Sequence, residues 1–122
     1  MSTAALSGRR ILVVEDDYMI ATEIQGELER AGATVIGPVS SVRKALRLTE
    51  TETVDAAVLD VNLGEEASFP IAEALVAKSV PFLFCTGYSS GDVPEEWQHA
   101  MIVMKPLKIT ALKQLLANVS PS

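Results

Sequence analysis

Hydrophobic residues along this chain gather in short, mostly apolar runs. Four of these runs are Ile11–Val14, Val54–Leu59, Val80–Cys85 and Met101–Met104. Such runs of aliphatic residues are typical of strands that are buried on both faces of a parallel sheet. A fifth run, Thr34–Val39, contains a proline, which places that strand near an edge of its sheet. The pattern predicts five strands.

The segments between these strands change to a helical period. Apolar residues in Tyr18–Ala31 recur three and four positions apart, Asp17 can act as the N-cap, and Gly32 follows as a stop. A second helix is predicted over Val42–Leu48, opened by Ser40 or Ser41. The core of a third is Ile71–Ala77, with an inner face of Ala72, Leu75 and Val76. A last amphipathic helix carries Leu107, Ile109, Leu112, Leu115 and Leu116.

The segment between the fourth and fifth strands is less regular, because it contains two glycines and a proline. It has room for one or two turns of helix after Pro94, so we expect it to be short or mobile. Trp97 is predicted to anchor this short helix to the core. His99 lies alone in a polar stretch, and we expect it to be exposed.

Strict alternation of strands and helices predicts an α/β fold, a parallel sheet with helices on both faces and right-handed crossovers. With no glycine-rich loop after the first strand, the flavodoxin-like doubly wound order 2-1-3-4-5 is favoured over a dinucleotide-binding half. The ligand crevice of that order lies at the carboxyl ends of strands one and three. At 122 residues the chain is expected to form one domain, residues 1–122, with a loose tail over residues 1–8.

The charge and cysteine content narrow the class of protein. A net charge of −6 with few clustered cations argues against sequence-independent nucleic-acid binding and favours protein partners. The single cysteine, Cys85, cannot form an internal disulfide and is expected to be a buried, inert thiol in a reducing compartment. No apolar run is long enough for a membrane span or a signal sequence, so a cytoplasmic protein is expected.

Polar side chains of useful chemistry follow four of the predicted strands. Glu15-Asp16, Asp60, Thr86 and Lys105-Pro106 stand at successive strand ends. If the strands are parallel neighbours, acids, a hydroxyl and an amine meet at one edge of the sheet. Such a set can bind a hard cation such as Mg²⁺ and accept a phosphoryl group, because the dication and the lysine offset the repulsion between anions.

The strand ends resemble those of the receiver domain of bacterial two-component response regulators, and the resemblance runs from Arg10 to about Val119. The motifs are Val13-Val14-Glu15-Asp16, Val58-Leu59-Asp60-Val61-Asn62, Phe84-Cys85-Thr86-Gly87 and Met104-Lys105-Pro106. The resemblance implies phosphorylation of Asp60 by a histidine kinase or a phosphotransfer protein, and a signal passed to a protein target or a role as phosphate sink. It further implies that the domain is not an enzyme in the ordinary sense, although it assists the phosphorylation and dephosphorylation of Asp60.

The resemblance also implies a role for each strand-end residue. Asp16 and Asp60 would contact Mg²⁺ directly, Glu15 would act through water, and the carbonyl of Asn62 would complete the protein ligands. Lys105 and the Thr86 hydroxyl would meet the phosphoryl oxygens, and the Lys105-Pro106 bond would be cis. Asp17 is better assigned to capping the first helix.

Two departures from the family pattern concern the signal. Ile102 stands where receivers usually carry the aromatic residue that reports phosphorylation, and the loop Leu63-Gly64-Glu65-Glu66 should be more flexible than usual. Phe84-Cys85-Thr86-Gly87-Tyr88 looks like the Phe-Ala-Thr-Gly-x-Tyr motif, shortened or shifted by one residue, of a receiver subgroup that is common in alphaproteobacteria and often single-domain. Our hypothesis is that the segment from Gly87 to Trp97 rearranges on phosphorylation, with Tyr88 as the moving aromatic.

Other interpretations remain open at this point. Acidic residues after a strand are often solvated loop positions, and Lys105 could be a surface charge, but neither reading explains why the set converges. A pseudo-receiver that docks partners regardless of phosphate is the main alternative. A haloacid-dehalogenase-type phosphatase is disfavoured because Asn62 stands where its second aspartate belongs. No helix-turn-helix follows Val119, so direct transcriptional activity is not expected unless the chain is an excised fragment.

Overall fold

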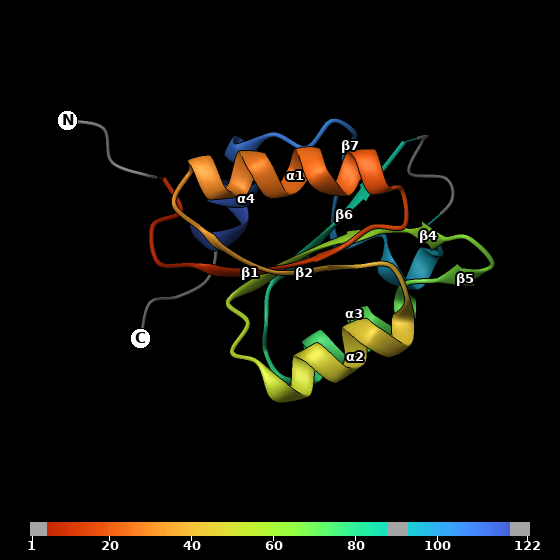
Figure 1. Ribbon diagram of the computed structural model, residues 1–122. Coiled ribbons are helices and arrows are strands. Elements are labelled where there is room, and N and C mark those ends of the chain that lie inside the picture. Colours follow the sequence, from red (N-terminus) through yellow and green to blue (C-terminus); the bar gives the residue numbers. More distant parts are fainter. Residues whose placement is uncertain (1–4, 88–92, 118–122) are drawn as a thin grey trace.

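A parallel sheet with two helices on each face forms the body of the protein (Figure 1). The computed structural model describes residues 5–87 and 93–117. The sheet has the order β2-β1-β3-β6-β7, which confirms the predicted flavodoxin-like order. Its strands are β1 (Arg10–Val14), β2 (Thr34–Val39), β3 (Ala56–Asp60), β6 (Phe82–Thr86) and β7 (Met101–Met104). The helices are α1 (Tyr18–Arg30), α2 (Val42–Thr51), α3 (Phe69–Ala77) and α4 (Ile109–Ala117).

Burial on both faces explains the continuous apolar runs. In β1, Ile11 and Val13 face the layer of α1 and α4, whereas Leu12 and Val14 face the layer of α2 and α3 (Figure 1). All four side chains are at most 1 % exposed. The helices of the first layer pack against the sheet through Ile24, Leu28, Leu112 and Leu115. Those of the second layer pack through Ala45, Ile71, Ala72 and Leu75.

The predicted helix caps are confirmed. Asp17 Oδ1 accepts hydrogen bonds from the amides of Met19 and Ile20, at 2.9 and 3.1 Å. Of the two serines considered for α2, Ser41 is the cap, because its Oγ accepts from the Lys44 amide at 3.2 Å. These contacts satisfy amides that lack a partner in the first turn of a helix.

Some expectations about burial and about the bounds of the elements are wrong. Val76 is 56 % exposed, because it lies about 90° around the helix from the stripe that buries Ile71, Ala72 and Leu75. The third and fourth strands begin at Ala56 and Phe82, two residues later than predicted, whereas α3 contains the predicted helical core Ile71–Ala77. The segment expected to be a loose tail is anchored at Leu6, which is 1 % exposed and donates its amide to the carbonyl of Ala31 at 2.8 Å.

The loop after β3 forms a short hairpin that the sequence did not predict. Its strands are β4 (Asn62–Leu63) and β5 (Glu66–Ala67), and Gly64 occupies the turn with φ +73°. A positive φ suits glycine because it has no Cβ. Glu66 Oε2 also accepts a hydrogen bond from the Val42 amide at 3.2 Å. The hairpin that follows Asp60 is therefore tied to the start of α2.

The segment before β7 has one short 3-10 helix, η2 (Glu95–Trp97), among its described residues. Trp97 is 8 % exposed and its ring lies 6.1 Å from that of Phe84 and 6.5 Å from that of Phe69. His99 is exposed and stacks on Trp97. The predictions of a short helix, an anchoring tryptophan and an exposed histidine are confirmed for this part of the chain. Within the described ranges, no helix has both the length and the apolar character that crossing a membrane requires.

Candidate functional site

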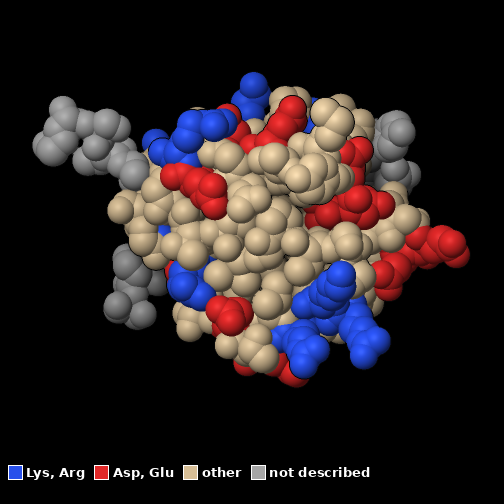
Figure 2. Space-filling model, in the orientation of Figure 1, with Lys and Arg blue, Asp and Glu red and all other residues tan. Residues whose placement is uncertain are grey.

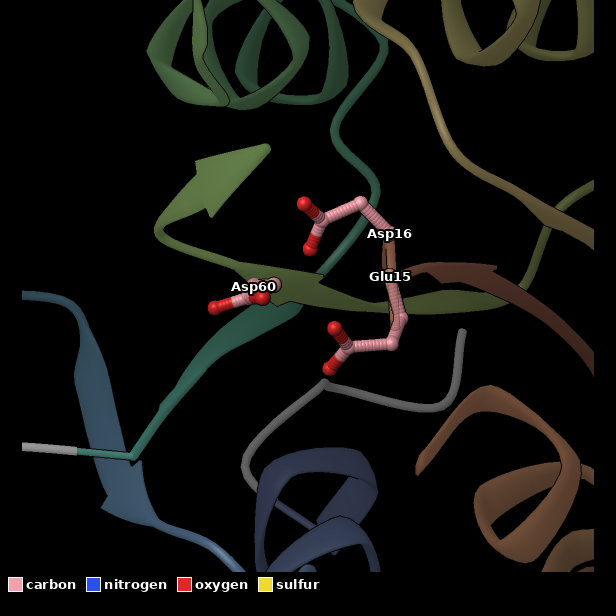
Figure 3. Close-up of side chains that lie close together, drawn as sticks. All are labelled: Glu15, Asp16 and Asp60. Carbon is pink, nitrogen blue, oxygen red and sulfur yellow. The ribbon is translucent and has the colours of Figure 1, made fainter. Parts of the chain in front are cut away.

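Three carboxylates come together where β1 and β3 end. Glu15 and Asp16 follow β1 directly, and Asp60 is the last residue of β3. The pairing of Val14 with Leu59 brings the two strand ends level. Figure 3 shows the three side chains directed towards a common space, and one oxygen from each lies within 4.8 Å of the others. Glu15 is 4 % exposed, whereas Asp16 is exposed.

Lys105 brings a positive charge to the same place. Its Nζ lies 2.7 Å from Glu15 Oε1 and 3.2 Å from Asp60 Oδ2. Lys105 directly follows β7. Its backbone amide donates a hydrogen bond to the Thr86 carbonyl at 2.8 Å, which holds the ends of β6 and β7 together. The Lys105-Pro106 bond is cis, as the resemblance implied.

The ionisation of the site follows from burial and close charges. Burial raises the pKa of Glu15, and Asp60 raises it further, against the opposing effects of Lys105 and of the Asp17 amide, which donates to Glu15 Oε2 at 3.0 Å. Burial by itself lowers the pKa of Lys105, but the hydrogen bond with Glu15 and the charge of Asp60 outweigh it, so the pKa is raised. The ammonium therefore stays charged at neutral pH.

Thr86 and Asn62 complete the surroundings of Asp60. A pocket of about 310 Å³ is lined by Ile20, Asp60, Asn62, Thr86, Gly87 and Lys105. Thr86 is 3 % exposed and ends β6, while Asn62 begins the β4–β5 hairpin. The structure thus brings together every residue that the sequence predicted for the site.

The donor set fits a hard dication. Lys105 pairs with two of the three clustered carboxylates, Glu15 and Asp60, and the buried negative charge of Glu15 beside a second carboxylate is unfavourable without further compensation. Oxygen is the ligand atom that Mg²⁺ prefers, and Mg²⁺ usually takes only a few protein ligands and keeps several waters. The exposed carboxylate of Asp16 leaves room for such waters.

Comparison with known proteins agrees with this geometry. Residues 11–117 match the response regulator receiver domain family. The chain belongs to this family. It has the fold of receivers, which belong to two-component signalling systems. In these systems a phosphorylation event carries the signal.

Two solved structures show the likeness over nearly the whole receiver. SdrG from Sphingomonas melonis Fr1 is 41 % identical, with a TM-score of 0.77, over 96 % of this chain and 97 % of that one. The BeF₃-activated conformation of SdrG, from Pseudomonas melonis Fr1, is 39 % identical with a TM-score of 0.73, over 96 % and 97 % of the two chains.

A relative among curated proteins is longer. The transcriptional regulatory protein PdtaR of Mycobacterium tuberculosis is 25 % identical over 108 residues, which is 85 % of this chain and 53 % of that protein. The receiver therefore spans about half the length of the curated relative that it matches.

Some features of this receiver were not predicted from the sequence. Ile20 lines the Asp60 pocket from α1, and a Cβ built on Gly64 would lie 3.8 Å from Asp16 Oδ2. The position of Ile20 could have been found from the helical period, because Ile20 lies in the first turn of α1, beside the strand ends. The second feature depends on the β4–β5 hairpin, whereas the sequence predicted only a flexible loop over Leu63-Gly64-Glu65-Glu66.

Of the two residues in the signalling hypothesis, Ile102 and Tyr88, only Ile102 lies in the described part of the chain. Ile102 is partly buried and pairs with Phe84 in the sheet, so no aromatic ring occupies the usual reporting position. Tyr88 lies outside the described residues. The hypothesis that the segment from Gly87 to Trp97 rearranges stays a prediction.

Proposed function

We propose that this receiver accepts a phosphoryl group on Asp60 and that Mg²⁺ at the acidic cluster assists the transfer. The observation that carries the proposal is the position of the Asp60 carboxylate, which shares a pocket with Thr86 and lies 3.2 Å from the ammonium of Lys105. A nucleophile, a fixed cation and a hydroxyl thus surround one space that can hold a small anion.

The proposed reaction is phosphoryl transfer from a phosphohistidine. An Asp60 carboxylate oxygen forms a bond to phosphorus, the phosphorus–nitrogen bond of the donor breaks, and the imidazole leaves with the electron pair. The donor is proposed to be a sensor histidine kinase or a phosphotransfer protein. The receiver assists this transfer and the later hydrolysis of the acyl phosphate; it does not turn over a separate substrate.

Each residue has one proposed role. Lys105 leaves its contacts with Glu15 and Asp60 to pair with a phosphoryl oxygen, and the Thr86 hydroxyl donates to another. Asp16, Asp60 and the Asn62 carbonyl are the proposed direct ligands of Mg²⁺, and Glu15 acts through water. When bound, Mg²⁺ neutralises negative charge on the carboxylates and on the incoming group.

The signal is proposed to pass to a protein partner, or to end in a phosphate sink, through the segment from Gly87 to Trp97 with Tyr88 as the moving aromatic. Ile102 supports this proposal, because it has no ring to rotate inward. The activated state recorded for the SdrG relative supports a conformational response in this subgroup. The unpaired thiol of Cys85 supports a reducing, cytoplasmic compartment.

The test is phosphorylation by a small donor. Wild type, Asp60→Asn and Asp17→Asn are incubated with acetyl phosphate and Mg²⁺, and intact masses are measured with and without a chelator. Asp17→Asn is the matched control, because asparagine also caps a helix and Asp17 faces the helix amides rather than the pocket. We expect one added phosphoryl group in wild type and Asp17→Asn only with Mg²⁺, and none in Asp60→Asn. An unmodified wild type would favour the phosphate-independent docking domain.

A further inference from the structure

Three basic side chains lie together on the outer surface of α2. Arg43, Lys44 and Arg47 are exposed, and with Ser41 they line a shallow hollow. Figure 2 shows Lys and Arg side chains gathered over α2, at the lower right of the molecule. We call Arg43, Lys44 and Arg47 the α2 basic patch.

The patch is unusual for this protein because three cations without an ion-pair partner among the described residues lie close together on one helix. The receiver has 10 Lys and Arg against 16 Asp and Glu, yet three of those cations fall within one turn and a half of helix. Within residues 5–87 and 93–117, the cations in ion pairs are Arg10, Arg30 and Lys105. No member of the α2 basic patch has an ion-pair partner in that part of the chain.

The position of the patch on α2 is unfavourable for the isolated helix. Its cations occupy the first turns, where the helix dipole favours negative charge, and the first turn has no acidic residue. Arg43 and Arg47 are also four positions apart, the spacing at which like charges repel. The hydrogen bond from the Val42 amide to Glu66 satisfies the end of the helix but leaves the three cations unpaired. The arrangement therefore does not serve the stability of α2.

We propose that the α2 basic patch docks an acidic segment of a partner protein, at a surface separate from the phosphoacceptor pocket. Guanidinium groups pair with carboxylates through two parallel hydrogen bonds, and two of the three cations are arginines. The three side chains span about 6 Å along the helix axis, which suits two or three carboxylates on a short peptide segment.

The surroundings of the patch favour a peptide over a nucleic acid. A nucleic acid presents charge along its whole length, and its binding usually needs more phosphate contacts than three cations supply. Glu50 is exposed on the same helix, and Glu65 and Glu66 are exposed on the neighbouring hairpin. These acids and the net charge of −6 repel a long polyanion, whereas a short acidic segment can meet the patch alone.

The test uses hexaglutamate as the probe and nitrogen-15 NMR as the readout. We expect hexaglutamate to shift the amide signals of residues 42–48 in wild type at low salt, and high salt to abolish the shifts. Arg43→Gln/Lys44→Gln/Arg47→Gln should weaken binding by about tenfold or more. The matched control is Lys78→Gln/Lys108→Gln/Lys113→Gln, which removes the same charge from exposed positions elsewhere and should bind like wild type.

Three outcomes would overturn the proposal. They are equal loss of binding in both triple variants, shifts centred outside α2, and tighter binding of hexathymidylate than of hexaglutamate. Arg43→Lys/Arg47→Lys keeps the charge and should bind hexaglutamate more weakly than wild type, which provides a test even if the glutamine variant unfolds. Asp60→Asn should bind the probe like wild type, so failure of the phosphorylation proposal would not affect this one.

Discussion

The Lys105 ammonium lies closer to Glu15 than to Asp60, at 2.7 Å against 3.2 Å. Glu15 is almost fully buried, and its other oxygen accepts the Asp17 amide. The lysine is therefore held by a carboxylate at the end of β1 while it remains within reach of the phosphoacceptor at the end of β3. This arrangement makes the stability of the apo protein depend on Lys105.

Lys105→Met should destabilise the metal-free protein. Loss of one partner from a buried ion pair costs about 3–5 kcal/mol, and because the Lys105 side chain is 18 % exposed we expect about 2 kcal/mol. The measurement is urea unfolding in the presence of a chelator. Mg²⁺ should stabilise the variant more than wild type, since it replaces the lost charge. Lys108→Met, at an exposed position, is the control, and equal stability of the two variants would contradict the prediction.

Gly64→Ala should affect both stability and phosphorylation. Gly64 has φ +73°, which costs a residue with a Cβ about 1 kcal/mol, and the added Cβ would stand 3.8 Å from Asp16 Oδ2. Gly8→Ala is the matched control, because Gly8 has φ +78° with no atom within 4 Å of a built Cβ. Both variants should lose similar stability in thermal unfolding, and only Gly64→Ala should change the rate of phosphorylation by acetyl phosphate. An equal rate in the two variants would show that the hairpin turn does not influence Asp16.

Cys85 should resist thiol reagents in the folded protein. Burial raises its pKa from 9.0 to about 11, and the residue is 1 % exposed. A difference of two pKa units leaves about a hundredfold less thiolate at pH 8 in the folded state than in the unfolded state. Because the pKa is raised on folding, this thiol lowers stability as the pH rises from 9.0 towards 11. The measurement is the rate of reaction with a disulfide reagent in buffer and in urea, with Cys85→Ala as the blank; rapid reaction in buffer would be inconsistent with the buried position.

Trp97 should report the proposed signal. It is the single tryptophan of the sequence, and it packs on Phe69, Phe82 and Phe84. If the segment from Gly87 to Trp97 rearranges, beryllofluoride with Mg²⁺ should change the fluorescence of Trp97 in wild type and leave that of Asp60→Asn unchanged. NMR spectra of the same samples should show the largest shifts in that segment. Unchanged signals there would exclude the proposed readout while leaving phosphorylation of Asp60 possible.

Local patterns in the sequence were sufficient to predict the five strands of the main sheet, the four α-helices and the grouping of the site residues at one edge of the sheet. Continuous apolar runs require burial on both faces, and alternation with helices requires parallel strands, so the carboxyl ends of β1, β3, β6 and β7 must share one side of the sheet. Asp60, Thr86 and Lys105 could therefore be placed together before any distance was known. The cap at Asp17 was also predictable, and the cap of α2 could be narrowed to Ser40 or Ser41, because a cap depends on residues only two or three positions away.

Only the tertiary structure decided which of these groups touch. The pairing of Lys105 with Glu15, the hairpin contact of Glu66 with the start of α2 and the burial of Leu6 join segments that are distant in sequence, so no local period encodes them. Val76 shows the same limit within one helix: α3 is apolar around most of its circumference, and only its packing against the sheet determines which side is buried. Sequence determined the chemistry available at the strand ends, and register, side-chain conformation and packing determined its contacts.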